Sequence, residues 1–163
     1  MGRHDEAIAQ ARQAQGRDQL SPMINTEVVE ALYSAGRLDE ALDVGRKALQ
    51  LAPRFPPIHW RLGNVYQAMG RHEESVIAFE EAIVLSQRGS FYLGPLGSAY
   101  AAAGRREDAR RVLDELTQRA EQEYVASMNF FAIYLALGDM DAAARILDEM
   151  IRDGDDGVVW IKS

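Results

Sequence analysis

Cysteine is absent from the 163-residue chain, so the sequence offers neither disulfides nor thiolate chemistry. No apolar run approaches the roughly 20 residues of a membrane span, and the N-terminus lacks the apolar core of a signal peptide. Basic residues are fewer than acidic ones: the chain has 18 Lys and Arg against 25 Asp and Glu, and its net charge is -7. A protein that binds the phosphate backbone of a nucleic acid needs a basic face. These shortages predict a cytoplasmic product that contacts neither membrane nor nucleic acid.

Glycine, by contrast, recurs every 34 residues, at Gly2, Gly36, Gly70, Gly104 and Gly138. A small residue follows each glycine five positions later: Ala7, Ala41, Ser75, Ala109 and Ala143. A period of this length, with a glycine turn between two apolar helical patterns, predicts a helix-turn-helix solenoid. The expected fold class is therefore all-α, a right-handed superhelical solenoid of antiparallel helix pairs.

The predicted single domain covers residues 1–163. It comprises a half repeat at 1–21, four complete pairs at 22–55, 56–89, 90–123 and 124–154, and a partial helix at 157–163. The half repeat opens at the Gly2 turn with a helix expected over 5–15, and is interpreted either as the edge of a fragment or as a terminal cap. Ser21 and Pro22 are typical of a helix start. Gly94 and Pro95 predict a delayed or kinked first helix in the third pair.

Other positions also recur in phase with the glycines. Four residues before them lie Leu32, Tyr66, Tyr100 and Tyr134; eight before lie Val28, Leu62, Leu96 and Phe130; twelve after lie Ala14, Ala48 and Ala82. Gly63 and Gly97 supply small residues beside two of the leucines, whereas Val29 and Phe131 are large there. With these residues the chain resembles the tetratricopeptide repeat family over nearly its whole length. More narrowly, residues 55–63 and 152–162 resemble the C-terminal repeat arrays of bacterial multidomain regulators, which implies a larger regulatory protein.

Two sets of polar residues could carry chemistry. Paired carboxylates follow the turns as Asp5-Glu6, Asp39-Glu40, Glu73-Glu74 and Glu107-Asp108. Such pairs can divide acid and base roles, but the first turn of a helix also stabilises negative charge, and this second interpretation is favoured. The histidines are His4, His59 and His72, and neither His4 nor His72 has a second metal ligand three or four residues later. The sequence therefore predicts a protein that is not an enzyme and uses no metal or cofactor; enzymatic activity would require an active domain upstream.

The resemblance implies that the first helix of each pair lines a concave groove. Its inward positions give the predicted partner-binding residues, which are Tyr33, Trp60, Arg61, Asn64, Gln67, Phe91, Met128 and Asn129. His59 takes the place where the family often buries a tryptophan, so that Trp60 faces the groove or packs on the neighbouring first helix. The groove lacks the lysine clamp with which some members grip an acidic C-terminal tail.

The predicted function is a non-catalytic protein–protein interaction module that binds a peptide or a partner helix in this groove. Aromatic and arginine side chains are enriched among interface anchors, and preformed helices reduce the ordering cost of binding. The alternative is a self-assembling structural scaffold, a homo-oligomer that stacks through its terminal repeats.

Overall fold

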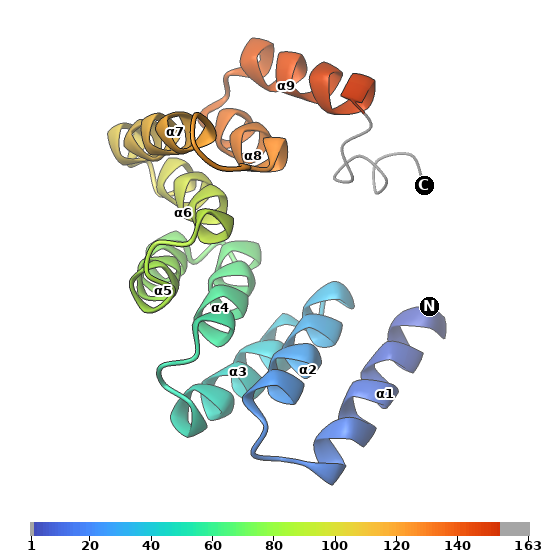
Figure 1. Cartoon of the computed structure of the whole chain (residues 1–163). Coiled ribbons are helices and arrows are strands. Elements are labelled where there is room, and N and C mark those ends of the chain that lie inside the picture. Colours follow the sequence, from blue (N-terminus) through green and yellow to red (C-terminus); the bar gives the residue numbers. More distant parts are fainter. Residues whose placement is uncertain (1, 154–163) are drawn as a thin grey trace. The chain divides into compact units, whose positions relative to one another are not determined.

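In the computed structural model, residues 2–153 are described, and they form nine α-helices and no strand (Figure 1). The helices are α1 (Gly2–Arg17), α2 (Pro22–Ser34), α3 (Leu38–Leu51), α4 (Pro56–Ala68), α5 (His72–Leu85), α6 (Ser90–Ala102), α7 (Arg106–Ala120), α8 (Ser127–Leu137) and α9 (Met140–Asp153). The chain divides into two compact units, one ending at Gln87 and the other starting at Arg88. The expected partial helix at 157–163 lies outside the described residues.

Unit 1 contains α1 to α5. Its helices form the antiparallel pairs α2/α3 and α4/α5, α1 packs on α2, and the first helices α2 and α4 also contact each other (Figure 1). Val29, Leu32, Ile58 and Phe79 are fully buried in its core. The close approach of α4 and α5 depends on Gly63, because a Cβ there would lie 2.6 Å from Cε1 of Phe79. The small residue next to Leu62 thus makes room for the phenylalanine ring.

Unit 2 contains the pairs α6/α7 and α8/α9, and α6 packs on α8. Leu93, Leu116 and Ile133 are fully buried. The delayed helix start expected at Gly94-Pro95 was wrong, since α6 begins at Ser90 and includes Pro95. The kink, which was the alternative, stays a prediction. Proline normally clashes with the backbone and Cβ of the preceding residue. Gly94 has no Cβ, which removes part of that clash.

Each pair turns at a left-handed glycine, with φ of 72° at Gly36 and Gly70, 78° at Gly104 and 77° at Gly138. At Gly36, the N–H of Arg37 donates to the carbonyl of Leu32 at 2.9 Å, and the N–H of Gly36 donates to that of Tyr33 at 2.9 Å. This Schellman pattern satisfies carbonyls that the helix end would leave unpaired. The turn expected at Gly2 was wrong, because Gly2 belongs to α1 and is helical.

The helix starts follow the sequence closely. Ser21 caps α2 by accepting a hydrogen bond from the N–H of Ile24, as predicted, and Pro22 is the first helical residue. The acidic pairs lie in the first turns of α3, α5 and α7. An arginine directly after the turn glycine holds one carboxylate of each pair. These ion pairs are Arg37–Glu40 at 2.6 Å, Arg71–Glu74 at 2.5 Å and Arg105–Asp108 at 2.8 Å.

Candidate partner-binding surface

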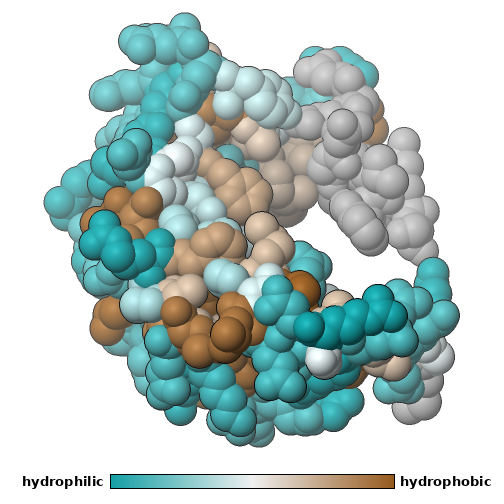
Figure 2. Space-filling model, turned by 60° about the horizontal axis from the view of Figure 1, so that its bottom comes forward, coloured by the Kyte–Doolittle hydropathy of each residue, from teal (hydrophilic) through white to brown (hydrophobic). Residues whose placement is uncertain are grey.

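The candidate surface of unit 1 is one face of α4 together with the adjacent part of α2. An α-helix turns about 100° per residue, so Trp60, Arg61, Asn64 and Gln67 share one side of α4. All four side chains are half-buried, as is Tyr33 on α2. We call this set of five residues the α2/α4 face. Figure 2 shows that hydrophilic residues cover most of the visible surface and that hydrophobic residues gather in separate patches.

Arg61 is fixed from two directions. Its guanidinium carbon lies 4.3 Å from the centre of the Trp60 ring, and its Nη1 donates a hydrogen bond to Oε2 of Glu30 on α2. Glu30 accepts a further hydrogen bond from the hydroxyl of Ser34 at 3.2 Å. A cation over a tryptophan face contributes roughly 0.5–1 kcal/mol at exposed sites. The indole and the guanidinium are therefore held in place, and the positive charge is already matched by a carboxylate.

His59 explains why Trp60 lies on this face. The His59 side chain is buried on the opposite side of α4, with 9% of the residue exposed. Its Nε2 lies 2.7 Å from the carbonyl oxygen of Pro53. Because a carbonyl oxygen only accepts, Nε2 carries the proton and donates. The histidine takes the interior position, and the indole falls one residue later on the other face.

The remaining predicted residues belong to unit 2. Phe91 is 59% exposed at the start of α6 and makes an edge-to-face contact with Tyr92, with ring centres 5.1 Å apart. Met128 and Asn129 are half-buried on α8. A Cβ on Gly94 would lie 2.2 Å from Oδ1 of Asn129, so this amide fills the space beside the α6 backbone. Asn129 thus packs inside unit 2, and Phe91 presents the larger accessible surface.

Sequence reasoning missed the structural role of two polar side chains. The bond between Glu30 and Arg61 connects residues 31 apart, and no local sequence pattern reveals it. Asn25 is buried and fully used: its amide nitrogen donates to the carbonyls of Gln19 and Ser21 at 3.0 and 2.8 Å, and its Oδ1 accepts from Gln15 at 2.7 Å. Asn25 lies 34 residues before His59, at the same position of the repeat. Two polar residues at this one position were the signal in the sequence that it can bury a hydrogen-bonded side chain.

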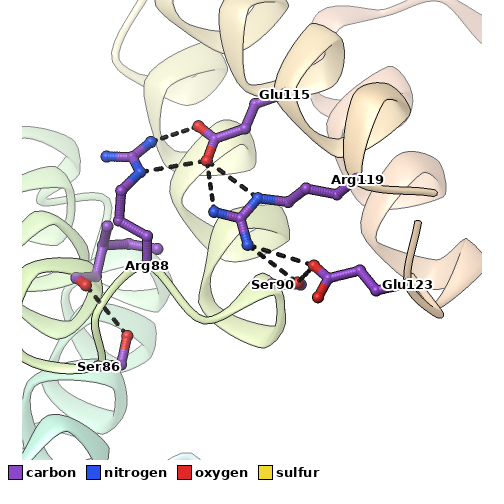
Figure 3. Close-up of polar contacts among 7 residues, drawn as sticks. Ser86, Arg88, Ser90, Glu115, Arg119 and Glu123 are labelled. Carbon is purple, nitrogen blue, oxygen red and sulfur yellow. Dashed lines mark hydrogen bonds and ion pairs between the residues drawn. The ribbon is translucent and has the colours of Figure 1, made fainter. Parts of the chain in front are cut away.

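The densest charge network lies at the start of unit 2 (Figure 3). Arg88 and Arg119 both bind the carboxylate of Glu115, Arg119 at 2.9 Å. Arg119 also contacts Glu123 at 3.3 Å, and Glu123 accepts a hydrogen bond from Ser90. Partial burial opposes ionisation of Glu115, but the bonds and charges of Arg88 and then Arg119 hold its pKa below the ordinary value. The network joins the first residues of unit 2 to α7.

Two further observations limit the chemistry of the described residues. No group of three or more His, Asp or Glu side chains among them could hold a metal ion. Over the same residues, no helix has the length and apolar character needed to cross a membrane.

Comparisons with known proteins identify the repeats independently. A family model described as "TPR repeat" matches residues 30–70, and models described as "Tetratricopeptide repeat" match residues 56–87 and 100–160. A search of curated proteins found no matching sequence.

Several solved structures are similar in fold. A thermophilic TPR protein of Thermus thermophilus has a TM-score of 0.79 and 19% identity, and the match covers 99% of this chain and 89% of that one. A tetratricopeptide repeat protein from Parabacteroides merdae has a TM-score of 0.68 and 17% identity over 98% and 64% of the two chains. MamA from Desulfovibrio magneticus RS-1 has a TM-score of 0.69 and 16% identity over 94% and 88%. These likenesses confirm the predicted fold class, an all-α superhelical solenoid.

Proposed function

Because the chain belongs to the tetratricopeptide repeat family, whose repeats generally mediate protein–protein interaction, we propose that it is a non-catalytic module that binds a peptide or a partner helix on the α2/α4 face. One observation carries this proposal: Arg61 is held against Trp60 and bonded to Glu30 before any partner arrives. Side chains that are already ordered lose less conformational entropy when a ligand binds.

The same contact indicates how the ligand is recognised. Glu30 neutralises Arg61, so a partner carboxylate would have to compete with an existing ion pair. Trp60 instead offers an aromatic surface, and the Asn64 amide offers both a donor and an acceptor to an extended backbone. A ligand held by stacking and by amide hydrogen bonds fits this face better than an acidic tail. The resemblance of residues 55–63 to arrays of bacterial regulators supports a place for this module within a larger regulatory protein.

The test is selection of peptides from a phage-displayed library of random dodecapeptides on the full chain. Dissociation constants of the selected peptides are then measured by fluorescence anisotropy. The double variant Trp60→Ala with Asn64→Ala should weaken binding by about tenfold or more, since it removes the aromatic surface and the amide pair.

Glu73→Ala is the matched control, because Glu73 is exposed in the first turn of α5 and lies outside the α2/α4 face. It should leave affinity unchanged. Equal affinity of the double variant and the unsubstituted chain for every selected peptide would count against this face as the binding surface.

The alternative of self-assembly through the terminal repeats stays a prediction, since residues 157–163 lie outside the described part of the chain.

A further inference from the structure

A second surface lies on the other side of α4, where α3 and α5 flank it within unit 1. An open pocket of about 260 Å³ there is lined by Leu49, Leu62, Ile77 and Ala78, together with His59, Tyr66, Glu74 and Glu81. We call it the α3/α5 pocket. A cavity of about 150 Å³ holds a benzene molecule. The α3/α5 pocket therefore has room for one aromatic or branched aliphatic side chain.

The pocket presents apolar surface to solvent. Ile77 is 59% exposed in the middle of α5. Val84, seven residues later on the same side of the helix, is 70% exposed but does not line the pocket. Covering apolar surface is worth about 25 cal/mol per Å². A partner side chain that entered beside Ile77 would gain this burial without moving any helix.

The corresponding pocket one repeat earlier has the opposite character. It has a volume of about 380 Å³, and its lining includes Gln15, Asn25 and Lys47 where the α3/α5 pocket has Leu49, His59 and Glu81. Its charged residues, Arg12 and Lys47, are both cations. The repeat architecture thus forms a pocket in both repeats. The side chains that differ between the two pockets make the α3/α5 pocket apolar and anionic.

Glu81 is the carboxylate of this pocket that has no cationic partner within the described residues. Glu115, 34 residues later at the same repeat position, binds the guanidinium groups of Arg88 and Arg119 (Figure 3). Four residues after Glu81 the chain has Leu85 in place of an arginine. Within the described residues, Glu81 forms no hydrogen bond or ion pair. Glu74, in contrast, is already paired with Arg71 at 2.5 Å.

We propose that the α3/α5 pocket binds a segment of a protein partner in which a large apolar side chain is adjacent to a lysine or arginine. The apolar side chain enters beside Ile77, and the cation binds Glu81 as Arg88 and Arg119 bind Glu115. Helical geometry places this pocket opposite the α2/α4 face, because Leu62 lies about 160° around α4 from Asn64 and Trp60 lies about 100° from His59. The α3/α5 pocket is therefore a second site, separate from the α2/α4 face.

The probe is again the phage-displayed library of random dodecapeptides, selected on the full chain carrying Trp60→Ala so that the α2/α4 face is weakened. The selected peptides should share a large apolar residue next to Lys or Arg. Ile77→Arg should weaken their binding by about tenfold or more, because it places a charged side chain in the apolar wall. Glu81→Lys should remove the preference for Lys and Arg through charge repulsion.

Val84→Arg is the matched control, since it adds the same charge to an exposed position of the same helix outside the pocket, and it should leave binding unchanged. Ile77 is largely exposed, so Ile77→Arg should retain the helical circular dichroism and thermal midpoint of the parent. The proposal is overturned if no selected peptide depends on Ile77, if Val84→Arg weakens binding equally, or if Glu81→Lys leaves the selected sequences unchanged. If Ile77→Arg unfolds, Glu81→Lys still tests the proposal through the loss of the preference for Lys and Arg.

Discussion

Gly63→Ala tests the helix packing that holds the α2/α4 face. An alanine methyl at position 63 would lie 2.6, 2.7 and 2.8 Å from three ring atoms of Phe79. Carbon atoms in good contact are about 3.5–4.0 Å apart, so the methyl is roughly 1 Å too close to each atom. Phe79 has 0% exposure, and its ring has no solvent-filled space into which it could turn. The substitution must push α4 and α5 apart.

The expected magnitude follows from two opposing contributions. Inserting a methyl group into a packed core costs typically 1–3 kcal/mol. Replacing glycine by alanine inside a helix returns up to about 1 kcal/mol. The net loss should therefore be about 0–2 kcal/mol in the free energy of unfolding, measured by urea titration with far-UV circular dichroism.

Gly16→Ala provides the control, because Gly16 is also helical and a Cβ there meets no atom within 4 Å. It should keep or raise stability by up to about 1 kcal/mol. Adding Phe79→Leu to Gly63→Ala should show a favourable coupling of at least roughly 0.5 kcal/mol, as expected for residues in contact. If Gly63→Ala were as stable as Gly16→Ala, the packing argument would be refuted.

Gly70→Ala should destabilise the chain by about 1–2 kcal/mol, although its surroundings are open, because φ is 72° there; an unchanged urea midpoint would contradict this. Glu115 has a lowered folded-state pKa, so its stabilisation is present above its unfolded pKa and is lost as pH falls through the folded pKa. Glu115→Gln should thus cost about 0.5–1 kcal/mol at neutral pH and flatten the acid side of the stability curve. Asp114→Asn, at an exposed position outside the network, should leave the free energy of unfolding at neutral pH unchanged. A double-mutant cycle of Glu30→Gln and Arg61→Ala should give a coupling of about 0.5–1 kcal/mol in the free energy of unfolding. Zero coupling would mean that this ion pair does not hold Arg61 in place.

Features set by local backbone chemistry were predictable from the sequence. The glycine at each turn was assigned correctly at Gly36, Gly70, Gly104 and Gly138, because a positive φ favours glycine over every other residue. The cap at Ser21 follows from its hydroxyl and from Pro22 behind it. The turn glycines and the helix cap act within a few residues of the chain, so their roles can be read from the local sequence of each repeat.

Features that depend on distant partners were not predictable in the same way. The position of Asn129 against Gly94 joins residues 35 apart, and the ion pair between Glu30 and Arg61 joins residues 31 apart. The periodic pattern places such residues on a helix face but does not show which of them meet. The start of α6 before Pro95 was not predicted, because Gly94 lacks the Cβ that would otherwise clash with the proline ring.

Amide chemical shifts test most directly whether a peptide binds the α2/α4 face. The full chain carrying Ile77→Arg, which weakens the α3/α5 pocket, would be labelled with ¹⁵N and titrated with a dodecapeptide selected on that variant. The largest changes should fall on Tyr33, Trp60, Asn64 and their neighbours in α2 and α4, including the indole N–H of Trp60. Changes that gather on α3 and α5 while these residues stay unshifted would contradict the claim.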